Sequence, residues 1–294
     1  MTKHGAAAWI LAGPALLVIA VFFALPVAAG LALSLSDFDI YALADLSTLR
    51  FVGLHNYAQL LQTPLFWQAL GNTLYFVVIG VPVSIGLSLA AALLLDSRFA
   101  RWHGFFRTSL FAPVVTTVVA VAVIWRYLLH TRYGLVNQGL GAIGVAPVDW
   151  LGDPVWSMPA IIAFAAWKNF GYNMIILLAA LQAVPRELYE AARIDGAGAL
   201  ARFTDVTLPS LVPTLVLVGV LTVSGYFQLF AEPYVMTQGG PLRSTFSMLY
   251  LMYEEGFRWW NLGNASAVAF LLFVVIFCAS WAMLRFDRDA PGRR

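Results

Sequence analysis

Residues 185–213, PRELYEAARIDGAGALARFTDVTLPSLVP, are the longest charged interruption between two apolar segments of this chain. Pro185 suits the first position of a helix, where its missing N–H would have no partner. Glu190 adds negative charge near the start, where the helix dipole favours it. Gly196 and Gly198 supply the backbone freedom to end that helix and turn into a second one. We call residues 185–213 the elbow.

The second helix of the elbow is expected to end at Leu208 and Pro209, because proline cannot continue a helix. The sides of the elbow carry small residues such as Ala191 and Ala192. A charged helix lined with small side chains can approach another protein closely without burying groups that need a partner. The composition therefore predicts a docking element.

Three short motifs follow one another in the elbow: Glu190-Ala191-Ala192, Asp195-Gly196-Ala197 and Val206-Thr207-Leu208-Pro209. Their order and spacing resemble the EAA motif of ABC importer permeases. The resemblance implies that residues 185–209 are the cytoplasmic loop through which a membrane subunit rests on its ATPase. It assigns ATPase coupling to Glu190, Ala191, Ala192, Asp195, Gly196, Ala197, Leu208 and Pro209. The alternative is an interfacial amphipathic helix that joins two spans.

Composition indicates an integral membrane protein of the all-α class. Of the 294 residues, 61% are hydrophobic and 11% are charged, whereas soluble domains carry about 25% charged residues. Cys278 is the single cysteine, which leaves no disulfide framework and no cysteine-ligated metal site. The net charge of +2 includes no basic run suited to nucleic acid.

Six apolar runs are long enough to cross a bilayer, which takes about 20 residues. They are residues 6–35, 71–95, 104–128, 158–183, 210–230 and 265–284. The first run exceeds the roughly 7–15 apolar residues of a signal peptide core, so we expect it to be retained as a helix. The whole chain, residues 1–294, is then one transmembrane domain.

Basic residues in short loops set orientation, because such loops stay on the cytoplasmic side. With the N-terminus inside, that side receives Lys3, Arg98, Arg101, Arg107, Arg186, Arg193, Arg202, Arg285, Arg288, Arg293 and Arg294. We therefore expect both termini and the elbow to be cytoplasmic, with the elbow between the fourth and fifth spans.

The opposite connections carry further motifs: Phe51-Val52-Gly53-Leu54 with Asn56-Tyr57, Thr237-Gln238-Gly239-Gly240-Pro241, and Gly263-Asn264-Ala265-Ser266-Ala267. These look like the signature of the MalF-like branch of carbohydrate importer permeases, and with the elbow the resemblance covers about residues 14–284. It implies a prokaryotic inner-membrane protein that forms a heterodimer with a second, MalG-like permease. It also implies two ATPase subunits and an extracytoplasmic solute-binding protein. The large periplasmic insert of the maltose prototype is absent.

The chain has no residues for nucleotide hydrolysis or metal catalysis. Neither Lys3 nor Lys168 stands in the G-x-x-x-x-G-K-[ST] pattern of a phosphate-binding loop. The four histidines are scattered and form no metal-binding or triad spacing. We therefore expect no cofactor in this chain, with ATP and magnesium bound by the partner ATPases.

Two polar patches interrupt apolar spans, one in the fourth span and one in the fifth, made of Thr222, Ser224, Tyr226 and Gln228. Lys168 and Asn169 lie in the fourth span, where an ionisable group is costly. A lining that mixes polar and aromatic side chains suits a sugar. The MalF-like resemblance brings Ala166, Phe170, Asn173, Thr222, Tyr226 and Leu229 onto substrate-lining positions, with Asn169 beside them. The alternative is that Lys168 reaches the interface and the amides only join helices.

The sequence is thus interpreted as the permease subunit of an ATP-driven importer for a sugar or related polyol, with glycerol phosphate as one candidate. The implied mechanism is alternating access, in which closure of the ATPases moves the elbow and rocks the spans. The alternative is a self-sufficient secondary transporter or channel for a small polar solute, although no inverted repeat is visible.

Overall fold

The structure is a computed structural model that describes residues 3–42, 45, 49–97 and 102–288. All regular secondary structure in these residues is helical, apart from two isolated bridges, Ser36 with Phe51 and Asp39 with Asn261. Arg98, Arg101, Arg293 and Arg294, four of the residues used to predict orientation, lie outside the described residues. The chain divides into two compact units, residues 1–67 with 251–273 and residues 68–250 with 274–294, and each is described by itself.

Among the described residues, five helices are long and apolar enough to cross a membrane, and a bent pair of helices makes up to six spans. The five cover Leu11–Ser34, Pro64–Asp96, Pro154–Ala183, Ala199–Phe227 and Leu262–Arg285. The predicted third span is α5 (His103–Val115) followed by α6 (Val118–Leu128), with a bend of 100° between them. Pro113 near the end of α5 has no N–H to donate, and Thr116 and Thr117 adopt extended backbone. This local chemistry ends one helix and starts another.

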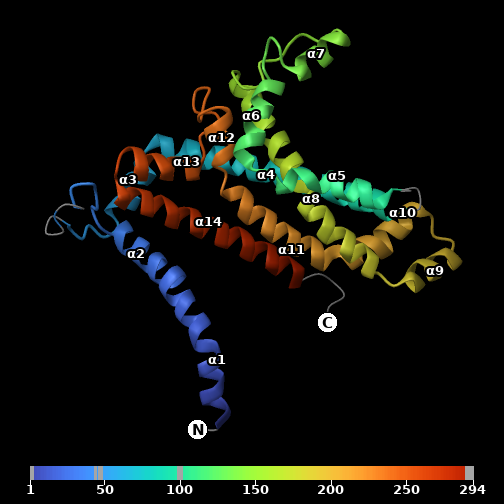
Figure 1. Cartoon of the computed structure of the whole chain (residues 1–294), viewed down its shortest axis with the longest axis horizontal. Coiled ribbons are helices and arrows are strands. Elements are labelled where there is room, and N and C mark those ends of the chain that lie inside the picture. Colours follow the sequence, from blue (N-terminus) through green and yellow to red (C-terminus); the bar gives the residue numbers. More distant parts are fainter. Residues whose placement is uncertain (1–2, 43–44, 46–48, 98–101, 289–294) are drawn as a thin grey trace. The chain divides into compact units, whose positions relative to one another are not determined.

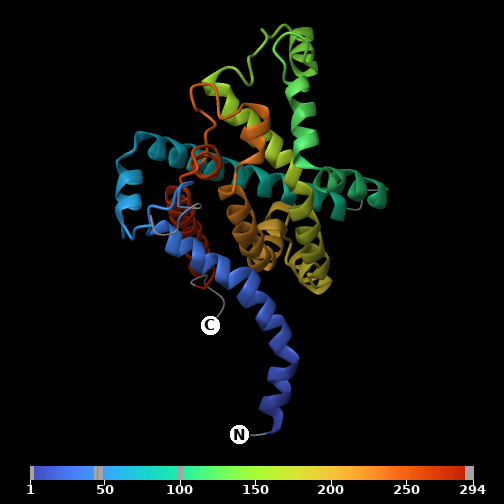
Figure 2. The same ribbon diagram turned by 60° about the vertical axis from the view of Figure 1, so that its left-hand side comes forward.

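The first unit begins with a long rod made of α1 (Lys3–Ile19), the π-helical turn η1 (Ala20–Ala24) and α2 (Leu25–Ser34). Figure 2 shows the rod in blue as one gently curved helix. Within the most apolar window of Leu11–Ser34 no residue is buried inside the protein. The other helical segments that the structure describes in this unit are α3 (His55–Gln62), the start of α4 (Pro64–Asp96), the end of α13 (Met248–Tyr253), η4 (Glu254–Arg258) and the start of α14 (Leu262–Arg288).

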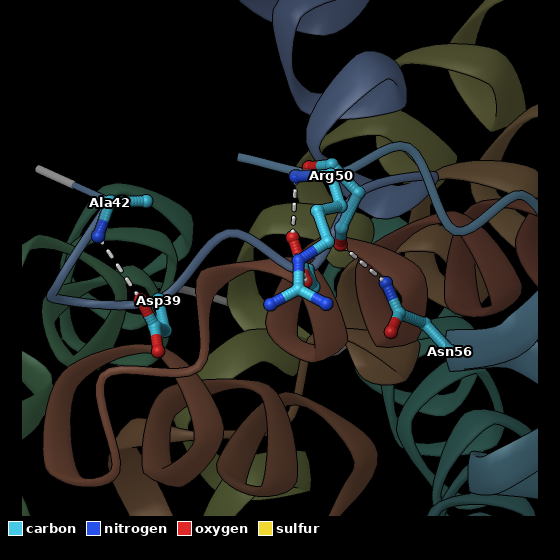
Figure 3. A network of polar contacts seen from close by, with 6 residues as sticks. Asp39, Ala42, Arg50 and Asn56 are labelled. Atoms are coloured by element: carbon cyan, nitrogen blue, oxygen red, sulfur yellow. Dashed lines mark hydrogen bonds and ion pairs between the residues drawn. The ribbon is translucent and has the colours of Figure 1, made fainter. Parts of the chain in front are cut away.

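A polar clasp holds the end of α2 to α3. The Asn56 amide donates to the carbonyls of Ser34 and Ser36 at 2.9 and 2.8 Å, and the Tyr57 hydroxyl donates to the Ser34 hydroxyl at 2.7 Å. Figure 3 shows the Asn56 side chain reaching this backbone, beside the contacts that order the following loop. A Cβ on Gly263 would collide with the Ser36 carbonyl. Residues from two of the motifs found in the sequence, 51–57 and 263–267, therefore pack against the same backbone at the end of α2.

The second unit is organised around α4 (Pro64–Asp96), α8 (Pro154–Ala183) and α11 (Leu208–Phe227). Their buried apolar side chains form one core cluster, made of Ala92, Leu95, Met174, Leu177, Leu178, Leu181, Leu211 and Val218. In Figure 1, α8 and α11 run beside one another, and they are in contact. Helix α5 packs against α8 at Gly171, where a Cβ would collide with the backbone carbonyl of Leu110. This unit also contains α7 (Leu135–Ala142) and α12 (Ala231–Met236).

The elbow contains α9 (Arg186–Ile194), α10 (Ala199–Arg202) and the π-helical turn η3 (Phe203–Thr207). Pro185 lies one position before the helix, as its N-terminal cap, and not at its first position. Gly196 has a φ of +80°, which side chains with a Cβ rarely adopt. The prediction of a turn at this glycine is confirmed.

The prediction that Leu208 and Pro209 end the second helix of the elbow is wrong. Residues 199–227 run as one helical rod through η3 into α11, and Pro209 lies in the first turn of α11. The Leu208 N–H bonds to the Phe203 carbonyl, a wider spacing than in an α-helix. The π-helical turn η3 shifts the backbone hydrogen bonds just before Pro209. The missing N–H of Pro209 therefore breaks fewer hydrogen bonds than it would inside a regular α-helix.

Candidate functional site

A polar cavity of about 350 Å³ lies inside the second unit, among α4, α8, α11 and α12. This volume falls within the roughly 300–1,000 Å³ of small-molecule sites. The cavity is lined by Phe76, Val114, Ala165, Asn169, Tyr172, Asn173, Leu221, Thr222, Gly225, Tyr226, Gln228, Leu229 and Glu232. Amides, hydroxyls, a carboxylate and aromatic rings thus meet in one place within otherwise apolar helices.

Tyr226 forms the aromatic wall of the polar cavity. Its ring stacks on Phe76 of α4, with centroids 4.9 Å apart and planes inclined by 26°. Gly80 makes this packing possible, because a Cβ there would come within 2.8 Å of the Tyr226 ring. The Tyr226 hydroxyl is buried beside the Ser84 hydroxyl and the Asn169 amide, and among the described residues neither hydroxyl makes a hydrogen bond of regular geometry. An unpartnered buried hydroxyl that lines a cavity is a group to which a ligand can bond.

Asn173 and Thr222 join α8 to α11 at the cavity wall. The Asn173 amide donates to the Thr222 hydroxyl at 2.9 Å, and that hydroxyl donates to the Val218 carbonyl at 2.7 Å. Both side chains are buried. Asn173 therefore contributes to helix packing, as the alternative interpretation expected, while its position also places it on the cavity lining.

The structure brings most of the predicted substrate residues together. Asn169, Asn173, Thr222, Tyr226 and Leu229 all line the polar cavity. Phe170 does not, and neither does Ala166: both line a separate apolar groove of about 780 Å³ between α4, α5 and α8. The lining face of α8 runs through Ala165, Asn169 and Tyr172, one residue before the predicted face. One residue is about 100° of helix rotation, enough to turn Phe170 away from the cavity.

Sequence reasoning missed Phe76, Tyr172 and Glu232. Phe76 lies in an apolar run that gives no sign of its role, and Tyr172 was noted only as part of a mixed segment. Glu232 had a signal that could have been used, since it is an acidic residue five positions after the end of a span. It reaches the cavity because α12 folds back against α8 and α6.

The Glu232 carboxyl lies in a low-dielectric environment at the edge of α12. Burial raises the pKa of Glu232 above its usual value, while the Lys168 ammonium acts in the opposite direction. Lys168 is itself buried, and its ammonium donates to the Val114 carbonyl at 3.1 Å. The intramembrane lysine noted in the sequence is thus held by α5 backbone next to the cavity.

The predicted coupling residues form an exposed surface. Glu190, Ala191, Asp195, Gly196 and Pro209 are exposed, and Ala192, Ala197 and Leu208 are half-buried. Within the elbow, a polar contact joins α9 to η3, between the Tyr189 and Thr207 hydroxyls, 3.0 Å apart.

Exposed apolar side chains accompany the coupling residues, since Leu188, Ile194 and Leu200 all project into solvent. No group of three His, Cys, Asp or Glu side chains suited to a metal ion occurs within the described part of the chain.

A family model described as binding-protein-dependent transport system inner membrane component matches residues 6–290. The chain belongs to this family. The resemblance to ABC importer permeases drawn from the elbow is thereby confirmed, and the protein is a multi-pass inner-membrane component of a transport system.

Two relatives are similar over almost their whole length. The lactose transport system permease protein LacF of Rhizobium radiobacter is 36% identical over 286 residues, 96% of this chain and 94% of LacF. The trehalose/maltose transport system permease protein MalF of Thermococcus litoralis is 36% identical over 282 residues, which cover 94% of this chain and 92% of that MalF chain.

The fold is also found in a solved structure. A bacterial ABC transporter involved in the import of the acidic polysaccharide alginate contains a chain that matches with a TM-score of 0.81. The match has 23% sequence identity and covers 99% of this permease and 98% of that chain.

Proposed function

We propose that this permease carries a sugar or related polyol through the polar cavity of its second unit. The observation that supports this most directly is the lining: the unpartnered Tyr226 hydroxyl, the Asn169 amide and the Glu232 carboxylate surround a stacked aromatic wall. Hydroxyls of a sugar need hydrogen-bond partners, while the C–H faces of its ring pack on aromatic rings. The transport names carried by the two relatives, lactose and trehalose/maltose, point to the same class of cargo.

The proposed assembly contains a second, MalG-like permease, two ATPase subunits with their ATP and magnesium, and an extracytoplasmic solute-binding protein. The exposed small and apolar side chains of the elbow supply the ATPase-docking surface, with both termini and residues 185–209 on the cytoplasmic side. Because η3 and α11 continue the elbow without a break, a displacement of α9 can reach the cavity through one helical rod. This continuity supports alternating access driven by the ATPases.

The experiment is uptake into proteoliposomes that contain the complete complex and its binding protein. The panel of probes contains lactose and trehalose as uncharged sugars and sn-glycerol 3-phosphate as an anionic polyol derivative. We expect uptake of at least one uncharged sugar that requires ATP, and no ATP hydrolysis by the permease purified without its partners. ATP hydrolysis by that isolated chain, or ATP-independent uptake, would contradict the proposal.

The chain belongs to a binding-protein-dependent transport family, and no observation favours the alternative of a self-sufficient secondary transporter. The apolar groove that contains Phe170 and Ala166 is a less suitable path for a sugar, because its lining is almost entirely hydrocarbon. Substitutions in that groove serve as a control for the polar cavity.

A further inference from the structure

The described lining of the polar cavity contains an acidic side chain but no basic one. Glu232 is the one lining side chain, among the described residues, that carries a formal charge when ionised near neutral pH; every other lining residue is apolar, an amide, a hydroxyl or a phenol. Helix α12 lies against α8, which holds the carboxyl next to Asn169 and Tyr226. The cavity therefore has a single acidic group and no lining cation.

Two basic residues lie nearby, and each is engaged elsewhere. The Lys168 ammonium is directed to the Val114 carbonyl at 3.1 Å, and its side chain is not part of the lining. The Arg126 guanidinium of α6 reaches the far end of α12, where it donates to the Val235 carbonyl at 3.2 Å. In the described part of the chain no basic group comes within 4.0 Å of the Glu232 carboxylate. Its charge is thus offset by a hydrogen bond from its own backbone N–H and, at longer range, by Lys168.

Several hydrogen-bond donors of the lining are already used, whereas the Glu232 carboxylate offers acceptors. Donors on three lining residues are used inside the protein: the Asn173 amide bonds to Thr222, the Thr222 hydroxyl to Val218, and the Gln228 amide to Ser224 at 3.0 Å. The Glu232 carboxylate is acceptor-only when ionised, and its two oxygens can receive about four hydrogen bonds. The Asn169 amide and the Tyr226 hydroxyl can still donate, so a ligand suited to this lining brings donors for Glu232 and acceptors without a negative charge, as sugar hydroxyls do. Phosphate and carboxylate groups bring acceptors and a negative charge.

We infer that Glu232 sets the charge selectivity of the permease, so that the polar cavity admits uncharged or cationic sugars and excludes anionic ones. The inference rests on the proposed function of this cavity as the sugar path. The inference excludes glycerol phosphate as a substrate, which the sequence alone had left as a candidate. When ionised, Glu232 acts as a hydrogen-bond acceptor for sugar hydroxyls and as a negative charge that repels anions within a poorly screened space.

The test measures cavity charge without knowing the cargo. Gln228, an exposed lining residue, is replaced by cysteine in a Cys278→Ser background within the complete complex. The thiol is then modified with a cationic trimethylammonium-ethyl methanethiosulfonate or with its anionic sulfonate counterpart, at pH 8 and low salt. Both reagents react with the same thiolate, so the fraction of ionised thiol divides out of the ratio of the two rates. The ratio then reports the local electrostatic potential.

Glu232→Gln is expected to lower the cation-to-anion rate ratio about tenfold or more, as removal of a nearby charge in a partly desolvated site requires. Lys168→Gln should raise the ratio, because it removes the charge that offsets Glu232. Glu187→Gln is the control: it neutralises an exposed glutamate in the first turn of α9, outside the cavity lining, and should leave the ratio unchanged. A ratio unaffected by Glu232→Gln overturns the inference even if sugar uptake is normal.

The uptake panel gives the second result. The unmodified complex should transport an uncharged sugar faster than sn-glycerol 3-phosphate, and Glu232→Gln should narrow that difference. Uptake of the anion that equals or exceeds uptake of the sugars overturns the inference. If the rate ratio shifts as expected while no sugar is transported, the charge assignment stands and the proposed function fails.

Discussion

The elbow and the polar cavity differ in how their residues are brought together. The elbow is one continuous stretch of sequence with exposed side chains, one glycine at positive φ and a single polar contact to η3. The cavity is assembled from α4, α8, α11 and α12, whose lining residues span positions 76–232. A local element tolerates surface changes and depends on backbone geometry, whereas an assembled site depends on close packing between distant helices. Five substitutions, two of them paired with a glycine control, test this difference.

The largest effect is expected where two helices of the second unit touch through a glycine. Gly171→Ala places a Cβ against the Leu110 backbone, which cannot rotate away as a side chain could. We expect a loss of about 3 kcal/mol in stability, the upper end of the roughly 1–3 kcal/mol for overpacking. Thermal unfolding of the purified complex measures it.

Gly86→Ala is the matched control for that substitution. Gly86 is an exposed helical glycine of α4, and a Cβ there meets nothing within 4 Å. This variant should be neutral or more stable by about 0.5–1 kcal/mol, because alanine favours helix more than glycine does. Equal unfolding temperatures for both variants would show that the α5–α8 contact is not tight.

Tyr226→Phe separates binding from packing within the cavity. It removes a buried hydroxyl that has no hydrogen-bond partner in the described protein and keeps the ring stacked on Phe76. Stability should therefore be unchanged, while the apparent affinity for sugar should fall roughly tenfold to hundredfold, the equivalent of about 1–3 kcal/mol. Uptake kinetics and thermal stability are measured in parallel.

Asn173→Ala provides the contrast, because it breaks the bond from Asn173 to Thr222 between α8 and α11. It should lower stability by roughly 0.6–2 kcal/mol, the range for intramembrane hydrogen bonds. Unchanged sugar affinity in both variants, with stability reduced only in Asn173→Ala, would assign these residues to packing alone.

In the elbow, the backbone is expected to matter more than the side chains. Gly196→Val forces a β-branched residue into a φ of +80°, at a cost of about 1–2 kcal/mol, and should distort the turn between α9 and α10. Recovery of the ATPase during co-purification should fall, with the spans still inserted. Gly198→Ala is the control, since Gly198 is extended and a Cβ there meets nothing within 4 Å. Equal ATPase recovery from both variants would remove the docking role of the turn.

The smallest effect is expected for Tyr189→Phe, which removes the contact between the Tyr189 and Thr207 hydroxyls. One partly buried hydrogen bond contributes about 0.5–1.5 kcal/mol. If that contact transmits motion from α9 to the rod, uptake should fall relative to ATPase activity in the assembled complex. A proportional loss of both would indicate that the contact only stabilises the fold.

Most of the fold could be predicted from sequence because a bilayer requires apolar helices of about 20 residues, and runs of that length are visible without any tertiary information. The 100° bend between α5 and α6 was not predicted, although Pro113 marks its neighbourhood. The end of the elbow was also misplaced, since Pro209 breaks a helix only if the preceding hydrogen-bond ladder is regular, and η3 makes it irregular.

What the sequence alone determined about this permease is therefore local: the apolar spans, the elbow, the turn at Gly196, and the polar residues Asn169, Asn173, Thr222 and Tyr226. Tertiary structure decided which of these meet. It turned Phe170 into the apolar groove, and close approach at Gly80 and Gly171 brought α4 against α11 and α5 against α8. It also folded α12 back so that Glu232 joined the cavity. Helix rotation, close approach at glycines and the return of a short helix depend on contacts between distant residues, and a linear pattern does not contain them.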